Sequence, residues 1–295
     1  MSDPPAPPDR SMDEHRRVVR SLFPVLRCDT FEPVGGGWDC FTYDVDDAWI
    51  VQLPRHGKAE ETLRMQIRVL PELGREVSAH IPFPELTSFE PPAMAYRKLE
   101  GTPLSDLAAT PIDGIWPERL GRFLYDLHLV PLEFVGLRGT GPEGWRDRMR
   151  AQLDGFEELV VPLLSPDEAA RAHSMFDRYI EDAAVRFAES LVHADLGPEH
   201  VLVGPSGDLS GVIDWGDATP GDPAIDFAWL LHRAPDAGER ALAAYGGASD
   251  PTFRSRAAFY DALGPWHEVH DGVWSNQPAL VESGLRGVRE RLPRG

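Results

Sequence analysis

Apolar side chains in the first hundred residues are spaced at first as in a helix and then as in strands. Ser11 and Glu14 form a capping-box pattern, and the spacing after them predicts an amphipathic helix that ends at about Phe23. Short runs typical of strands follow at residues 31–34, 40–45 and 49–53. Three glycines separate the first run from the second, and two aspartates separate the second from the third.

One more helix and two more extended runs complete this part of the chain. Leu63, Ile67 and Leu70 lie at helical spacing, and the extended runs bracket residues 82–92. Strands on both sides of a helix predict a lobe with an antiparallel sheet, which we place at residues 11–100.

After residue 100 the spacing is mainly helical. Helices are indicated around Leu124 and Met149, and a second capping box at Ser165 predicts a helix that runs to about Ser190. Three short apolar runs, at 191–193, 201–203 and 211–213, then precede further helices. The pattern predicts an α+β fold of two lobes, with residues 101–295 forming the larger, mostly helical one.

Composition narrows the class of protein. The chain of 295 residues has no apolar run near the ~18 residues of a membrane helix. Residues 1–10 are rich in Pro and Asp, so we expect a disordered tail rather than a signal peptide. Two cysteines make neither a disulfide framework nor a zinc site. We expect a cytoplasmic protein without a membrane partner.

The formal net charge of −19 bears on the partners. Such a field repels the phosphates of nucleic acids, so we expect no nucleic-acid partner. It attracts cationic small molecules, although an acidic surface can also serve solubility alone. Lysine occurs only at Lys58 and Lys98.

Two carboxylates at strand edges carry the candidate chemistry. Asp195 follows the run at 191–193, and Asp214 follows the run at 211–213, so loops can present both to one cleft. A phosphoryl transferase needs one carboxylate to accept the proton of the attacking hydroxyl and further ligands to hold magnesium. The spacing fits Asp195 as the base, with His200 and Asp214 as metal ligands.

These residues carry a resemblance to a known family. His193 and Asp195, followed by His200, resemble the catalytic loop of protein kinases and of the antibiotic phosphotransferases that share their fold. The usual residue at the position of His200 is Asn; a histidine there is similar to the macrolide phosphotransferases and one branch of the aminoglycoside phosphotransferases. Residues 212–217 resemble the segment with the magnesium-binding Asp, and residues 221–228 resemble its usual sequel. The resemblance implies a two-lobed protein-kinase-like fold, ATP or GTP as phosphate donor, and Mg²⁺.

The resemblance also implies nucleotide-binding residues. The turn over the nucleotide phosphates matches Gly35, Gly36, Gly37 and Trp38, and glycine there lets backbone N–H groups approach the phosphates. Lys98 and Leu99 match the linker between the lobes, whose backbone receives the purine.

One position departs from the family pattern. Gln52 stands where kinases carry a phosphate-binding lysine, and Gln66 stands where they carry its glutamate partner. We therefore include Gln52 among the nucleotide-binding residues. The missing cation can come instead from Arg55 or Lys58. A second alternative is that backbone groups, magnesium and an amide side chain hold the nucleotide. A third is that the protein has lost its activity.

Several other residues have structural interpretations. His193 and Asp226 are interpreted as ties that hold the catalytic loop. The stretch after the motifs is interpreted as core of the helical lobe, with a wall of the acceptor pocket as the alternative; it comprises Phe259, Tyr260, Trp266, His267, His270 and Trp274.

The sequence thus predicts a small-molecule phosphotransferase whose acceptor is a hydroxylated, cationic antibiotic of the aminoglycoside or macrolide type. A metabolic kinase acting on choline, homoserine or a sugar is the first alternative. A nucleotide-binding pseudokinase, suggested by Gln52 and Gln66, is the second.

Overall fold

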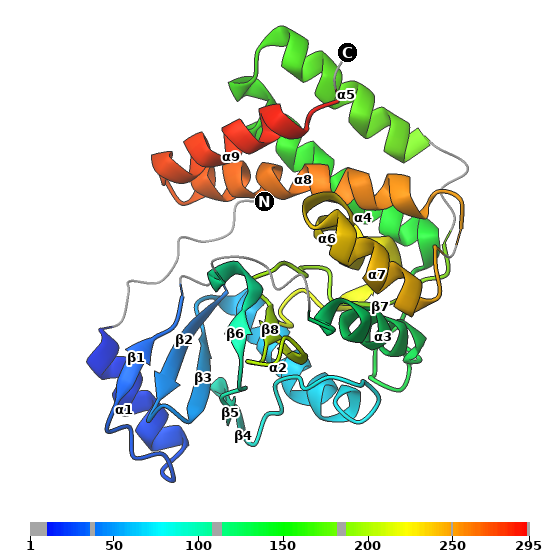
Figure 1. Ribbon diagram of the computed structural model, residues 1–295. Helices are drawn as coiled ribbons and strands as arrows, with labels where there is room; N and C mark the ends of the chain where they lie inside the picture. Colours follow the sequence, from blue (N-terminus) through cyan, green and yellow to red (C-terminus); the bar gives the residue numbers. More distant parts are fainter. Residues whose placement is uncertain (1–10, 36–38, 108–113, 182–186, 249, 294–295) are drawn as a thin grey trace.

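The computed structural model describes residues 11–35, 39–107, 114–181, 187–248 and 250–293. The predicted tail at 1–10 and three residues of the predicted phosphate turn, Gly36, Gly37 and Trp38, lie outside the described residues. Figure 1 shows an N-terminal sheet with two helices at one end of the molecule and a larger group of helices at the other. This is the predicted two-lobed α+β architecture.

A five-stranded sheet forms the N-terminal lobe, with strand order β1-β2-β3-β5-β4 and every pair antiparallel. Its strands are β1 (Phe31–Pro33), β2 (Cys40–Val45), β3 (Trp49–Pro54), β4 (Leu86–Phe89) and β5 (Pro92–Arg97). Successive side chains of a strand point to opposite faces, so Val51 packs in the cluster that contains α1 residues, and Ile50 packs in the cluster that contains α2 residues. The helices are α1 (Met12–Leu22) and α2 (Gly57–Leu73).

The capping box predicted for α1 is confirmed. The backbone N–H of Glu14 donates to Oγ of Ser11 at 3.3 Å, and the backbone N–H of Ser11 donates to Oε2 of Glu14 at 3.0 Å. These two bonds satisfy donors that a helix otherwise leaves unpaired at its start.

The C-terminal lobe is mainly helical. Its helices are α3 (Trp116–Leu129), α4 (Gly141–Leu159), α5 (Pro166–Glu181), α6 (Ala228–Arg233), α7 (Pro235–Tyr245), α8 (Phe253–Trp274) and α9 (Pro278–Arg291). Its 3₁₀ helices are η1 (Leu104–Asp106), η2 (Val161–Leu163) and η3 (Pro223–Phe227). Short strands in this lobe are β6 (Thr102–Pro103), β7 (Ser190–Val192), β8 (Val201–Val203), β9 (Leu209–Val212) and β10 (Thr219–Gly221).

Three sequence-based expectations need correction here. Extended runs were expected on either side of residues 82–92, but β4 (Leu86–Phe89) lies within that segment. The helix that begins after Ser165 is described as far as Glu181 and does not reach Ser190, because Ser190 belongs to β7, where it pairs with Gly221 of β10. Strands β6 and β10 were not predicted. Each contains a proline, Pro103 or Pro220, and proline argues against a strand because it cannot donate to the ladder.

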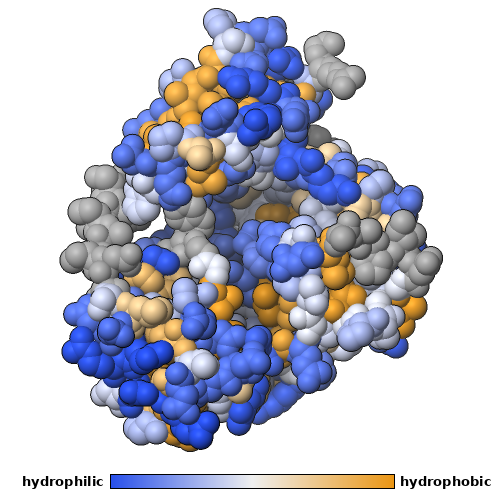
Figure 2. Space-filling view, turned by 60° about the vertical axis from the view of Figure 1, so that its left-hand side comes forward, coloured by the Kyte–Doolittle hydropathy of each residue, from blue (hydrophilic) through white to orange (hydrophobic). Residues whose placement is uncertain are grey.

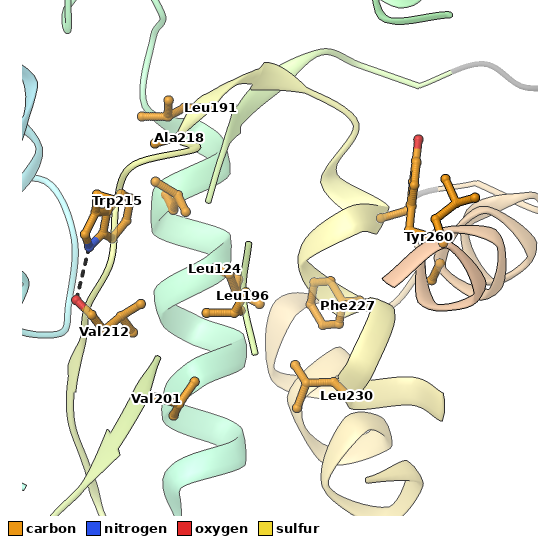
Figure 3. Close-up of a cluster of buried hydrophobic side chains, with 14 of the residues drawn as sticks. Leu124, Leu191, Leu196, Val201, Val212, Trp215, Ala218, Phe227, Leu230 and Tyr260 are labelled. Carbon is orange, nitrogen blue, oxygen red and sulfur yellow. Dashed lines mark hydrogen bonds between the residues drawn. The ribbon is translucent and has the colours of Figure 1, made fainter. Parts of the chain in front are cut away.

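An apolar cluster anchors the loops that carry the predicted chemistry. Figure 3 shows Leu196, Val201, Val212 and Trp215 gathered beside Leu124 of α3. All five side chains are buried, and Nε1–H of Trp215 donates to the carbonyl of Val212 at 3.1 Å. The ends of both loops are therefore fixed in the core, while Asp195 and Asp214 remain accessible.

Candidate active site

The loop between β7 and β8 carries Asp195, and the carboxylate of Asp226 fixes its start. Asp226 lies fully buried in η3 and accepts the backbone N–H groups of His193 and Ala194, each at 2.9 Å. Nε2–H of His128 donates to the same carboxylate at 3.0 Å. Ala194 has φ of 66°, a left-handed conformation uncommon for any residue but glycine. Asp226 thus holds a strained backbone immediately before Asp195.

His193 joins this loop to the loop after β9. Its Nε2–H donates to the carbonyl of Ile213 at 2.9 Å, and the backbone N–H of Ile213 donates to the carbonyl of His200 at 2.9 Å. Complete burial lowers the pKa of His193, so the ring stays neutral. Asp226 and His193 therefore tie the loop as the sequence indicated.

The two loops bring Asp195, His200 and Asp214 together. Nδ1–H of His200 donates to the backbone carbonyl of Asp195 at 2.7 Å, and the same nitrogen lies 3.8 Å from Oδ2 of Asp195. With its proton on Nδ1, the neutral ring presents Nε2 as an electron-pair donor. That nitrogen lies 3.7 Å from Oδ2 of Asp214, whose backbone also has a positive φ, of 61°.

The surroundings of Asp195 and His200 raise the pKa of both side chains. Burial, Asp217 and Asp214 raise the pKa of Asp195 to about 7, while His200 acts against the rise. Burial acts to lower the pKa of His200, but Asp195 and Asp214 outweigh it and raise that pKa. The Asp195 side chain is 56% exposed, so water in the cleft screens part of its shift; the direction, toward easier protonation, suits a general base.

His200 and Asp214 fit as two ligands of a magnesium ion whose remaining coordination positions are filled by other ligands. Two ligands on one Mg²⁺, each at about 2.0–2.1 Å, lie no more than about 4.2 Å apart, and the 3.7 Å between His200 and Asp214 satisfies that limit. Within the described ranges, no group of three or more His, Cys, Asp or Glu residues could hold a metal. A site with few protein ligands is typical of Mg²⁺ that is shared with phosphates. Its preference for oxygen favours Asp214, and His200 would contribute directly or through water.

The residues predicted to bind the nucleotide differ in backbone conformation and in the groups they contact. Gly35 has φ of 66°, which glycine adopts without strain. Leu99 lies against Gly211 of β9. The side chain of Lys98 forms ion pairs, because its Nζ binds Asp44 and Asp47 at 2.6 Å each. Its backbone N–H donates to the carbonyl of Ala48. Its side chain is therefore held by these two aspartates, and its backbone carbonyl stays available for the predicted contact with the purine.

A cavity of about 750 Å³ opens beside Asp195. The loop residues Asp195 and Glu199 line it together with Asp217, and α4, α6 and α8 supply most of the remaining wall. Figure 2 shows a face of the molecule that is hollowed near its centre, with polar side chains around much of the rim. The volume is that of a small-molecule site.

Part of the cavity wall was not predicted from the sequence. The side chains of Trp145, Arg148, Met149 and Gln152 line it from one face of α4. Their i, i+3, i+4 and i+7 spacing was the signal available in the sequence. Arg233 and Arg291 also line the cavity, and both contact the carboxylate of Asp261, at 3.1 and 3.7 Å.

The aromatic stretch of α8 divides between core and cavity. Phe259 stacks on Tyr179 with ring centroids 3.9 Å apart, and Trp266 is fully buried. Tyr260 and His267 line the cavity. This stretch therefore contributes to the core and to the cavity wall, through different residues.

Comparison with known proteins identifies the family. The chain belongs to the phosphotransferase enzyme family, whose sequence model matches residues 30–259. Viomycin phosphotransferase of Streptomyces vinaceus is 31% identical over 146 residues, which cover 47% of this chain and 49% of that protein. Protein YcbJ of Bacillus subtilis is 24% identical over 200 residues, 62% of either chain. The chain thus spans about half to three fifths of the curated relatives it matches.

Solved structures show the same fold over nearly the whole chain. A GDP and kanamycin complex of an aminoglycoside phosphotransferase of the 2″ class has a TM-score of 0.82 and 22% identity, covering 94% of this chain and 98% of that one. A macrolide 2′-phosphotransferase from Brachybacterium faecium has a TM-score of 0.71 and 21% identity, covering 96% and 99%. The kinase-like fold of the antibiotic phosphotransferases is confirmed. Among the described helices, none is long and apolar enough to cross a membrane.

Proposed function

We propose that this protein transfers the terminal phosphate of ATP or GTP to a hydroxyl group of an aminoglycoside or macrolide-type antibiotic, in the cytoplasm, and so confers resistance. The observation that carries the proposal is the convergence of Asp195, His200 and Asp214 at the edge of a cavity of about 750 Å³. Relatives solved with GDP and kanamycin, or with ATP and streptomycin, support a nucleotide and an amine-bearing acceptor.

Asp195 is the group that acts on the acceptor. Its carboxylate orients the attacking hydroxyl and accepts its proton as the new P–O bond forms. The bond from the terminal phosphorus to the bridging oxygen breaks, and the nucleoside diphosphate leaves. Asp214 and His200 would hold Mg²⁺, which would supply positive charge to offset the charge of the phosphates. His193 and Asp226 keep the two loops in register and touch no reacting atom.

The charges of the cavity wall support a cationic acceptor. Its carboxylates outnumber its arginines by five to three, and two of those arginines contact Asp261 of the same wall. Glu199 and Asp217 remain beside Asp195 to meet a protonated amine. A charge-assisted hydrogen bond of this kind contributes about 1.5–3 kcal/mol.

The test is a panel assay with purified protein, both nucleotides and mass detection of phosphorylated product. Aminoglycosides, macrolides and viomycin form one arm; choline, homoserine and simple sugars form the other. Product with an antibiotic supports the proposal, and product only in the second arm would replace it with a metabolic kinase. Nucleotide binding without any product would leave a pseudokinase.

A further inference from the structure

Because Gln52 is uncharged, its position lacks the positive charge that binds the nucleotide phosphates in kinases, and the proposed reaction needs another source of that charge. In kinases a lysine on the third strand cradles the nucleotide phosphates. Gln52 lies on β3 and shares its strand face with Ile50, toward α2. Its Oε1 is buried and has no hydrogen-bond partner among the described residues. Gln66 of α2, also buried, supplies no charge either.

The first turn of α2 offers a replacement. The backbone N–H of Arg55 donates to the carbonyl of Asp39 at 2.8 Å, and Nε2 of His56 lies 3.1 Å from Oδ1 of Asp39. These contacts place the start of α2 beside Asp39, the residue before β2. Lys58 follows in the first turn, and its side chain is exposed.

Lys58 lies close enough to Asp217 of the other lobe for its charge to affect the pKa of that carboxyl group. Burial, Asp39 and Asp214 raise the pKa of Asp217, and Lys58 opposes that rise. Asp217 lines the cavity next to the catalytic loop. The ammonium group therefore lies within electrostatic reach of the site, on a flexible four-carbon stem that can adjust to a phosphate.

Other nearby cations are already engaged. The guanidinium of Arg55 stacks on Phe41 at 3.9 Å, and its Nε–H donates to the carbonyl of Cys40. Lys98 is held by two aspartates, Asp44 and Asp47. Lys58 makes no ion pair with any residue that the structure describes.

We propose that Lys58 supplies the positive charge that holds the terminal phosphates of the nucleotide, in place of the third-strand lysine that this chain lacks. The proposal rests on the proposed phosphotransferase function. It assigns the contact to α2 instead of β3, and the partial positive charge of the α2 N-terminus adds to it.

The experiment compares nucleotide affinity by calorimetry in Lys58→Gln and in Arg68→Gln. Arg68 lies exposed on the same helix, about 15 Å further along it at about 1.5 Å per residue, so its loss matches the change in net charge. We expect Lys58→Gln to weaken magnesium-bound ATP and GTP by roughly ten- to hundredfold. Arg68→Gln should bind as wild type does. Adenosine and guanosine, which lack phosphates, should bind equally to all three proteins.

A second pair of variants removes the ambiguity of a folding defect. Lys58→Arg keeps the charge and should keep most of the affinity, and Gln52→Lys added to Lys58→Gln should restore it. Wild-type affinity for triphosphates in Lys58→Gln would overturn the proposal, as would an equal loss for the nucleosides. If the wild-type protein itself binds neither ATP nor GTP, the phosphotransferase function fails and this proposal fails with it.

Discussion

Nε2 of His200 lies 3.7 Å from Oδ2 of Asp214, although the two residues belong to different loops. Bonds from His193 to Ile213 and from Ile213 to His200 fix that separation. We expect His200→Ala and Asp214→Ala to weaken magnesium-bound nucleotide much more than metal-free nucleotide, because each removes a ligand that only the ion needs. Calorimetric titrations with and without Mg²⁺ measure both affinities. Equal losses in the two conditions would show that neither residue holds the ion.

Asp226 should act on activity through the backbone it holds. Asp226→Ala leaves the N–H groups of His193 and Ala194 and the ring of His128 without their acceptor, at a cost of about 1–3 kcal/mol for each buried group. We expect a lower free energy of unfolding in urea, and a kcat that falls more than nucleotide affinity. Asp226→Asn keeps one acceptor oxygen and should lose less of both. A folded Asp226→Ala protein with wild-type kcat would contradict the positioning role.

Acid should remove a specific part of the stability. Burial acts to raise the pKa of Asp250, but Arg256 and Thr252 outweigh it and lower that pKa to about 2. A lowered pKa stabilises the fold above the usual Asp value of about 3.9, and this contribution is lost as the pH falls toward 2. The difference in free energy of unfolding between wild type and Asp250→Asn should therefore be constant at neutral pH and shrink below about pH 4. A difference that does not change with pH would rule out this account of Asp250.

The dependence of acceptor KM on salt concentration should distinguish a cationic acceptor from an apolar one. The cavity wall carries more carboxylates than arginines, and the range of attraction between exposed charges falls from about 10 Å at 0.1 M salt to about 3 Å at 1 M. We expect acceptor KM to rise with salt, with a different response for the nucleotide. An uncharged acceptor, or a KM that stays flat across that range, would show that the acidity serves solubility only.

Features set by short stretches of sequence were predictable. The capping box at Ser11, the first three strands of the N-terminal lobe and the loops of Asp195 and Asp214 each depend on a few neighbouring residues. The family and fold followed from the same loops. The catalytic roles of Asp195, His200 and Asp214 remain predictions that the variants test.

Features set by distant contacts were not predictable. Strand β10 contains Pro220 and exists because β7 pairs with it. No partner for the side chain of Lys98 was evident in the sequence, but the sheet places Asp44 and Asp47 next to its ammonium group. Arg291 joins the cavity wall from the last turn of α9, far along the chain from the motifs.

The central claim is that Asp195 takes the proton of an acceptor hydroxyl during phosphoryl transfer. Its most direct test is turnover and nucleotide affinity measured on the same preparations of wild type and Asp195→Asn, with an acceptor found in the panel assay. The asparagine keeps the shape of the side chain but cannot accept the proton, and a general base contributes about 10²–10⁴ in rate. We expect kcat to fall by that factor while the affinity for magnesium-bound nucleotide stays nearly unchanged. An Asp195→Asn protein that retains most of its kcat would contradict the claim.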